Sequence, residues 1–313
     1  IGCLDIADRV GEPILGHRVV TLSREFMAGL LAKDTLEDNI ELAKHGIPRI
    51  DMVVCNLYPL TEEIAKVGAT REDVIEKTDI GGPSMIRAAA KGRRIVVSSP
   101  DCYGEVIAWL EAGCPNEEAF ITEGVAKAEH DAASYGLASA VYHGNGEYAG
   151  IIGTRASPCK YGENPYMQPA ALYATDTDDP LALPRFTLVD GDAPSYINWT
   201  DVHRLVDTAT RVAAGFDVNF GKVPVIALGA KHGNTCGAAV EDDVVSAIRW
   251  MLDGDLIAIF GGVVLLTCPV GKVEAELLRT HSMPEGQKRL LDGVFAPSFT
   301  EEAVAILGRK GGK

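Results

Sequence analysis

One stretch of the sequence combines residue types that can hold an anion and move a proton. Between Thr78 and Arg94 the chain reads TDIGGPSMIRAAAKGRR, in which Asp79 is followed closely by Gly81 and Gly82. The next residue is a proline, which is well suited to a first helical turn. Backbone N–H groups at a helix start, together with the positive end of the helix dipole, favour phosphate. We therefore expect a phosphate site at the two glycines, with the carboxylate of Asp79 beside it.

The same stretch places basic residues on one side of the predicted helix. Arg87 lies four residues after Pro83, and Lys91 lies four residues after Arg87. Gly92 is suited to end the helix. The alternative interpretation is a tight Gly-Gly turn followed by a solvated basic helix end, since Gly-rich turns often occur without a ligand.

A second segment, VVCNLYPL, places polar residues where a buried strand ends. Asn56 and Tyr58 follow an apolar run, and side chains at the carboxyl ends of parallel strands face the ligand crevice of such sheets. We expect both residues to contribute to the same site as Asp79. The alternative is a hydrogen-bonded structural element.

A third segment, VIALGAKHGNTCG, carries a Lys-His pair directly after an apolar strand. A histidine beside a lysine favours its neutral form, because like charges oppose protonation, and neutral imidazole can accept a proton near pH 7. His232 is therefore a candidate base and Lys231 its supporting cation. The alternative is a histidine whose ring is satisfied by a backbone carbonyl.

The elements that position these residues follow an alternating pattern. Short runs rich in Val and Ile alternate with helical patterns, which predicts βα units on a mostly parallel sheet. The chain is helical in pattern from Asn116 to about Val141. Beyond it, two apolar runs bracket a helix and predict a second α/β unit: VPVIALGA, DDVVSAIRWML and DLIAIFGGVVLLT. A Gly-, Pro- and Tyr-rich stretch between the two parts predicts a domain boundary near residue 150.

Composition limits the classes of partner. The 313-residue chain has a net charge of -15 and a pI near 4.9, which argues against general binding to nucleic acid or anionic membranes. It contains no run of 18 apolar residues, and its first residues lack the pattern of a signal peptide. The seven cysteines never form a Cys-x-x-Cys pair and the histidines show no metal-ligand spacing. We expect a cytoplasmic protein with reduced thiols and no bound metal.

Seven segments in a fixed order carry a family resemblance: HRVVTL, VVCNLYP, DIGGPSMIRAAAK, KYGENP, SYIN, KHGNTCG and FGGVV. They resemble the bifunctional purine biosynthesis enzymes that are both 5-aminoimidazole-4-carboxamide ribonucleotide (AICAR) formyltransferase and inosine monophosphate (IMP) cyclohydrolase. The resemblance implies a methylglyoxal-synthase-like parallel-sheet domain at 1–150, without its opening strand and phosphate loop. At 151–313 it implies the first half of a formyltransferase domain, which is cytidine-deaminase-like.

For the first domain, the resemblance implies closure of formyl-AICAR to IMP with loss of water. Asp79 and Lys91 would form a proton-transfer pair, and Tyr58 would donate to the formyl or adduct oxygen. The remaining residues implied to line the nucleotide pocket are Arg18, Thr21, Asn56, Gly81 and Gly82.

For the second domain, the resemblance implies formyl transfer from 10-formyltetrahydrofolate, a co-substrate and not a bound cofactor. His232 would accept a proton from the 5-amino group of AICAR, and Lys231 would support it. The residues implied to contact the nucleotide are Lys160, Tyr161, Ser195 and Asn198. The resemblance also implies a homodimer, because the family builds its formyltransferase site across subunits.

The sequence also departs from the family pattern. Val20 stands where the pattern GRVKTLHP has a lysine, and Tyr166 stands where NPHQ has a histidine. Lys160 replaces an arginine, which removes a bidentate phosphate contact. Two alternatives follow. One is a non-catalytic nucleotide-binding or subunit-interaction relative; the other is a truncated form of an ordinary bifunctional enzyme.

Overall fold

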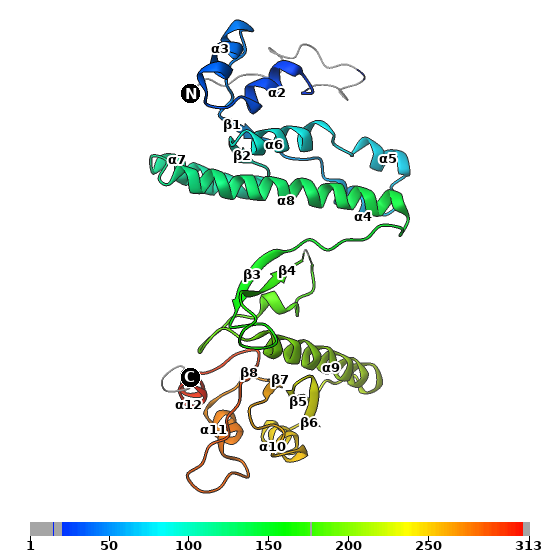
Figure 1. Cartoon of the computed structure of the whole chain (residues 1–313). Coiled ribbons are helices and arrows are strands. Elements are labelled where there is room, and N and C mark those ends of the chain that lie inside the picture. The colour runs from blue at the N-terminus through cyan, green and yellow to red at the C-terminus, as the bar shows by residue number, and fades with distance from the viewer. Residues whose placement is uncertain (1–14, 16–20, 176, 309–313) are drawn as a thin grey trace. The chain divides into compact units, whose positions relative to one another are not determined.

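The computed structural model describes residue 15, residues 21–175 and residues 177–308. The chain divides into two compact units, with the division after Ile152 (Figure 1). Both units combine helices with small sheets, so the chain is mixed α/β.

The first unit contains a parallel pair of strands with helices packed around it. β1 (Met52–Val54) and β2 (Ile95–Val97) pair in parallel, and Val53 lies opposite Val96. The helices and the one 3-10 turn described in this unit are α2 (Arg24–Leu31), α3 (Leu36–Lys44), α4 (Leu60–Ala65), α5 (Arg71–Glu76), α6 (Gly81–Lys91), η1 (Pro100–Cys102), α7 (Tyr103–Glu111) and α8 (Glu117–Gly144).

The packing of α6 in the core of the first unit determines where the start of this helix lies relative to the strands. Met85, Ile86, Ala89 and Ala90 recur at the spacing of one helix face and are buried against residues of α2, of both strands and of α8. Only three residues separate the end of α6 from β2, so α6 runs antiparallel to the strands. The start of α6 therefore lies toward the carboxyl edge of the parallel pair, where β1 also ends.

The second unit contains two sheets. β3 (Thr154–Cys159) and β4 (Ala170–Ala174) form an antiparallel pair. The other sheet has the order β6-β5-β7-β8, made of β5 (Val225–Lys231), β6 (Asn234–Glu241), β7 (Val263–Leu266) and β8 (Gly293–Phe295). The helical segments described here are η2 (Leu183–Arg185), α9 (Tyr196–Phe220), α10 (Val244–Gly254), α11 (Lys272–Thr280) and α12 (Glu301–Leu307).

The alternation of side chains along β5 separates two cores. Ile226, Leu228 and Ala230 are buried with residues of α9, whereas Ala227 is buried with residues of α10 and α11. The β5 strand is therefore covered on both faces, which explains why it reads as a continuous apolar run and not as a polar-apolar alternation.

The four-stranded sheet of the second α/β unit is mostly antiparallel, a strand arrangement that the apolar pattern did not specify. β5 is antiparallel to both β6 and β7, and only β7 and β8 run in parallel. The first part of DLIAIFGGVVLLT forms turns, because the Asp255 carboxylate accepts hydrogen bonds from the N–H groups of Ile257 and Ala258. The long helix expected from Asn116 is confirmed as α8, with 28 residues.

Candidate active site

Asp79 lies between α5 and α6, and its carboxylate occupies the start of α6. Its Oδ1 accepts a hydrogen bond of 2.8 Å from the N–H of Gly82. A Cβ at Gly82 would collide with Asp79 Oδ2 and would lie 2.8 Å from Leu57 Cδ2. The sequence needs glycine here because the carboxylate fills the space that a side chain would take. The N–H of Gly82 is therefore occupied by the Asp79 carboxylate, and phosphate binding at the two glycines stays a prediction.

Thr21 and Gly81 also meet at the start of α6. A Cβ at Gly81 would lie 2.7 Å from Thr21 Oγ1, so the threonine hydroxyl lies against the first residue of the helix. The structure thus brings together Thr21, Asp79, Gly81 and Gly82, as the sequence predicts. Arg18 and Val20 lie outside the described residues.

Tyr135 of α8 is the contact of Asp79 that the sequence analysis missed. Its hydroxyl accepts a hydrogen bond of 2.7 Å from the N–H of Asp79 and donates one of 2.8 Å to the carbonyl of Lys77. Burial raises the pKa of Tyr135, the hydrogen bond from Asp79 lowers it, and the charges of Asp79 and Tyr58 raise it further. The hydroxyl is therefore protonated at neutral pH and can act as donor and acceptor together.

Cys55 lies near Asp79, and Tyr58 lies near Lys77 and Tyr135. The Tyr58 side chain is 51% exposed, and the Lys77 ammonium lies 5.9 Å from the centroid of its ring. Burial raises the pKa of Cys55 to about 11, and the charge of Asp79 contributes to this rise. The Cys55 thiol is consequently protonated at neutral pH and is no nucleophile there.

The side chain of Asn56 is hydrogen-bonded to another residue of the first unit. Its side-chain amide contacts the hydroxyl of Tyr103, with Nδ2 at 2.9 Å and Oδ1 at 3.0 Å. Tyr103 is the first residue of α7, so the contact joins the end of β1 to that helix. This geometry fits the structural alternative that the sequence left open for Asn56.

The structure does not bring Lys91 to Asp79. Lys91 is the last residue of α6, whereas Asp79 lies just before its first residue. The helix places its two ends about 15 Å apart, which exceeds the reach of a lysine side chain. Asp79 and Lys91 therefore make no direct contact within this chain, and their role as a proton-transfer pair stays a prediction.

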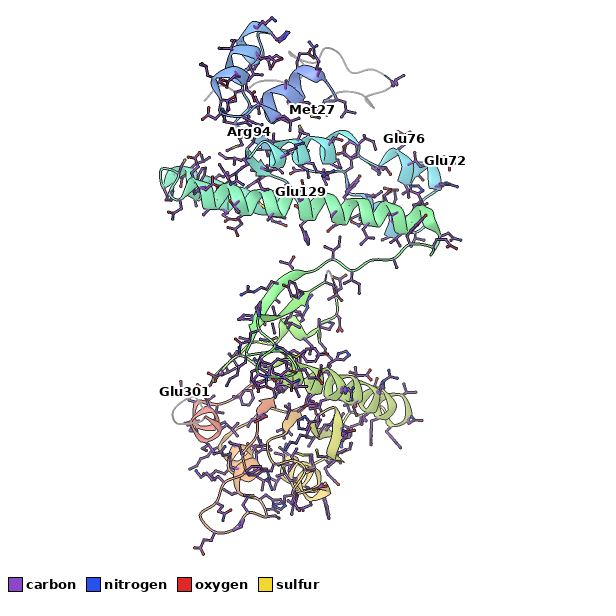
Figure 2. The ribbon with its side chains drawn as sticks, in the orientation of Figure 1. Met27, Glu72, Glu76, Arg94, Glu129 and Glu301 are labelled. Atoms are coloured by element: carbon purple, nitrogen blue, oxygen red, sulfur yellow. The ribbon has the colours of Figure 1, made fainter. Side chains whose placement is uncertain are left out.

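The neighbouring arginines bind other parts of the first unit. Arg87 pairs with Glu129 at 3.0 Å, and Arg93 pairs with Glu118 at 2.6 Å. Arg94 is buried and donates to the carbonyls of Leu30 and Ala32 at the end of α2, and Figure 2 labels both Arg94 and Glu129. Each of these three arginines therefore has a partner within the first unit.

In the second unit, Lys231 and His232 lie in the hairpin turn between β5 and β6. Lys231 pairs with Asn234, and the two central residues have positive φ angles, +52° at His232 and +75° at Gly233. This is the geometry of a two-residue hairpin turn. His232 is exposed, whereas Lys231 Nζ donates to the carbonyl of Phe260 at 2.6 Å.

Two residues of α9 hold this turn, and the sequence analysis named neither. The buried Asp201 accepts a hydrogen bond of 2.5 Å from the N–H of Gly233, and Arg204 donates one of 2.6 Å to the Gly233 carbonyl. Asp201 interrupts the apolar face that Trp199, Val202 and Leu205 present to the sheet. A buried acid on such a face is a signal for a specific partner.

The start of α9 also collects the other predicted residues of this unit. The Lys160 N–H donates to the carbonyl of Pro194 at 3.2 Å, and the N–H of Tyr196 donates to the carbonyl of Tyr161 at 3.0 Å. The Lys160 ammonium pairs with Asp192 at 2.9 Å. The segment of Lys160 and Tyr161 therefore lies beside the first turn of α9, as a common nucleotide site requires.

Ser195 and Asn198 form a capping box at the start of α9. Ser195 Oγ accepts a hydrogen bond from the Asn198 N–H, and Asn198 Oδ1 accepts one from the Ser195 N–H at 3.0 Å. Ser195 is 4% exposed. The structure thus uses both side chains to begin the helix, a role that the sequence analysis did not weigh.

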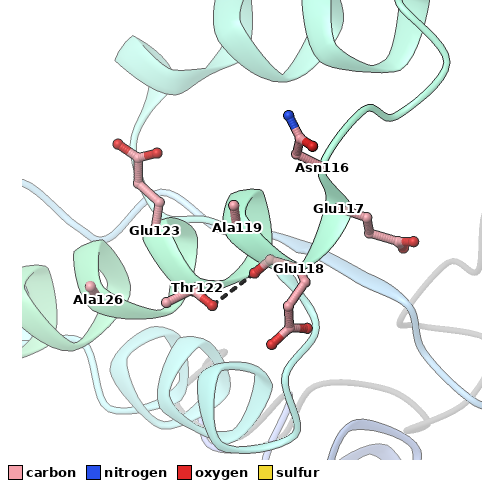
Figure 3. Close-up of a pocket in the computed structure, with 7 residues that line it drawn as sticks. All are labelled: Asn116, Glu117, Glu118, Ala119, Thr122, Glu123 and Ala126. Atoms are coloured by element: carbon pink, nitrogen blue, oxygen red, sulfur yellow. Dashed lines mark hydrogen bonds between the residues drawn. The ribbon is translucent and has the colours of Figure 1, made fainter.

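A pocket in the first unit lies away from these residues. It is formed at the start of α8 by Asn116, Glu117, Glu118, Ala119, Thr122, Glu123 and Ala126 (Figure 3). Glu118 precedes Tyr135 by 17 residues, or about 25 Å of helix, so the pocket is remote from Asp79. The negative charges of its three glutamates would repel a phosphate group.

No group of three or more His, Cys, Asp or Glu side chains is arranged to hold a metal ion among the described residues. None of the helices described is both long enough and apolar enough to span a membrane.

Comparison with known protein families shows which family the chain belongs to. A sequence model described as "AICARFT/IMPCHase bienzyme" matches residues 89–313. The chain belongs to the AICARFT/IMPCHase bienzyme family. The resemblance predicted from seven ordered segments is confirmed.

Relatives of this AICARFT/IMPCHase family chain are named "Bifunctional purine biosynthesis protein PurH". The protein from Rhodopirellula baltica is 34% identical over 317 residues, covering 98% of this chain and 57% of the relative. The protein from Streptococcus mutans is 35% identical over 322 residues, covering 99% of this chain and 59% of the relative. The AICARFT/IMPCHase family chain thus spans less than two thirds of the length of these relatives.

A solved structure, titled "Crystal structure of ForH", is 37% identical to the AICARFT/IMPCHase family chain. The match between the two covers 46% of this chain and 76% of the solved chain, with a TM-score of 0.39.

Proposed function

We propose that the chain acts in late purine biosynthesis as an IMP cyclohydrolase, which closes formyl-AICAR to IMP with loss of water. The observation that carries this proposal is the grouping of Asp79, Tyr58 and Tyr135 at the start of α6, in a chain whose relatives are named PurH. We also propose that residues 1–150 form a methylglyoxal-synthase-like cyclohydrolase domain. The parallel pairing of β1 and β2 supports this assignment.

The chemistry of ring closure matches the groups at this position. The carboxamide nitrogen attacks the formyl carbon of the same molecule, so the protein has to accept a proton and stabilise an oxyanion. Asp79 is the base, with Oδ1 held by Gly82 and Oδ2 over the space that a Gly82 side chain would fill. The hydroxyl of the half-exposed Tyr58 is the donor to the oxyanion, and the Lys77 ammonium near the Tyr58 ring adds positive charge. Orientation of the substrate supplies most of the acceleration.

A direct assay tests the cyclohydrolase function. The purified chain is mixed with formyl-AICAR and the formation of IMP is followed. Asp79→Asn is expected to lower kcat by roughly 10²- to 10⁴-fold, the range typical of a lost general base. Glu111→Gln, an exposed substitution on α7, is the matched control and should retain wild-type activity.

Two outcomes contradict the proposal in different ways. Wild-type activity in Asp79→Asn would remove the carboxylate from the mechanism. Binding of the nucleotide by the wild-type chain without IMP formation would favour the second candidate, a nucleotide-binding or subunit-interaction relative that has lost catalysis.

A further candidate activity is formyl transfer to AICAR from 10-formyltetrahydrofolate. We propose that residues 151–313 form the first, cytidine-deaminase-like half of a formyltransferase domain, that the protein is a cytoplasmic homodimer, and that His232 accepts the amine proton. The exposed position of His232, on a turn held by Asp201 and Arg204, supports this role. His232→Ala should abolish formyl-AICAR formation, and His203→Ala, an exposed histidine of α9, is its control. Equal activity in both variants would contradict the proposal.

A further inference from the structure

We propose that Tyr135 is a positioning residue of the cyclohydrolase site, which fixes the backbone at Asp79 so that the carboxylate faces the substrate in one orientation. The proposal rests on the proposed function for its catalytic consequence. The underlying contact is independent of that function, and both are tested separately below.

The Tyr135 hydroxyl makes two hydrogen bonds to one short segment. It accepts from the N–H of Asp79 at 2.7 Å and donates to the carbonyl of Lys77 at 2.8 Å. Both partners lie in the link between α5 and α6. One hydroxyl therefore holds this link at two points, Asp79 and Lys77, which precede Tyr135 by 56 and 58 residues.

These bonds complete the restraint of the Asp79 side chain. Gly82 holds the carboxylate at Oδ1, and Tyr135 holds the backbone nitrogen of the same residue. Rotation about the Cα–Cβ bond would take the carboxylate away from the Gly82 N–H, and the Tyr135 bond opposes the backbone shift that would compensate for it. A base that is held in this way spends less of its time in unproductive orientations.

The helix that carries Tyr135 is itself fixed to the sheet. One turn earlier on α8, Asp131 accepts a hydrogen bond of 2.6 Å from Ser98 Oγ and one of 2.9 Å from Lys127 Nζ. Ser98 directly follows β2 and is buried. Lys127, Asp131 and Tyr135 recur every four residues, so one face of α8 meets both the strand end and the Asp79 segment.

Burial at this contact favours a neutral tyrosine. Burial raises the pKa of Tyr135 and the nearby charges of Asp79 and Tyr58 add to the rise, although the hydrogen bond from Asp79 lowers it. The third group at this point is the Lys77 ammonium, which lies over the Tyr58 ring. A neutral hydroxyl keeps its proton for the Lys77 carbonyl throughout the physiological range.

Tyr135→Phe tests the proposal, because it removes the hydroxyl and keeps the ring. Tyr142→Phe, a half-buried tyrosine of the same helix, is the matched control. With formyl-AICAR as substrate, Tyr135→Phe is expected to lower kcat by about 10- to 100-fold with little change in KM, as a misplaced catalytic group does. A similar loss in Tyr142→Phe, or a rise in KM at unchanged kcat, would overturn the catalytic part.

A measurement without substrate tests the contact itself. In chain labelled with ¹⁵N-aspartate, the amide of Asp79 should exchange with solvent at least about tenfold faster in Tyr135→Phe than in wild type, because its acceptor is lost. Tyr142→Phe should exchange like wild type, and both variants should unfold near the wild-type urea midpoint. Unchanged exchange in Tyr135→Phe would overturn the proposal. If wild type forms no IMP while the exchange rate rises as expected, the proposed function fails and the contact stands.

Discussion

Cys55 reports on the charge of Asp79 without taking part in catalysis. Burial is the main cause that raises the pKa of its thiol to about 11, and the Asp79 carboxylate adds to this rise because a second negative charge nearby is unfavourable. Below this pH the thiol is protonated and reacts slowly, since alkylation requires the thiolate. The reactivity of one cysteine can therefore measure where the carboxylate points.

The resulting prediction is a pH profile. Iodoacetamide labelling of the Cys55 peptide, followed by mass spectrometry, should rise with pH toward a midpoint near 11. Asp79→Asn should move the midpoint downward, because it removes a negative charge that opposes ionisation. Glu111→Gln should leave the midpoint unchanged. A profile that is identical in Asp79→Asn and wild type would place the carboxylate away from Cys55.

At the residue scale, sequence reasoning singled out Asp79 and the two glycines but did not anticipate that the Gly82 N–H bonds the Asp79 carboxylate. A Gly-Gly helix start has the same sequence whether it holds a phosphate or a neighbouring carboxylate. The difference depends on the side-chain rotation of Asp79, which places Oδ2 where a Gly82 side chain would be. Tyr135 was missed because its partner is 56 residues away and nothing in the helical pattern marks which tyrosine makes the contact.

At the scale of elements, prediction succeeded where hydrophobic periodicity decides the structure. Both strands of the parallel pair and the long α8 follow directly from the apolar pattern. The strand directions in the second unit did not follow from it, because β5 is buried on both faces and reads like a strand of a parallel sheet. Only the two-residue turn at His232 and Gly233 reveals that β5 turns back into β6.

The start of α9 provides the prediction at this scale. Ser195→Ala removes the N-cap acceptor for the Asn198 N–H, which is worth about 0.5–2 kcal/mol of unfolding free energy. Urea unfolding should therefore show a lower midpoint at an unchanged slope. The control is Thr210→Ala on the exposed face of α9, which should leave the midpoint nearly unchanged. A Ser195→Ala variant that unfolds like wild type yet binds AICAR poorly would contradict the capping role and favour a nucleotide contact.

At the scale of the whole molecule, the net charge of -15 requires local capture of any nucleotide. Several cations in both units are already committed to carboxylates, including Arg87 with Glu129, Arg93 with Glu118 and Lys160 with Asp192. These pairs are exposed and each stabilises the fold only weakly. An exposed pair can exchange its carboxylate for a phosphate at small cost, so Lys160 retains its proposed role as a nucleotide contact.

The division into two units yields the last prediction. Residues 145–151 are all exposed, and Ile151 is 87% exposed, just before the division after Ile152. Exposed segments with few contacts are the preferred sites of limited proteolysis. Thermolysin, which cuts before large apolar residues, should therefore cleave first at Ile151 or Ile152 and release two resistant fragments. Replacing both isoleucines with aspartate removes the recognised side chains and should slow this cleavage strongly, while the urea midpoint stays near that of wild type. First cuts elsewhere, for example in the turns that follow Asp255, would show that local opening within the second unit is easier than access to this segment.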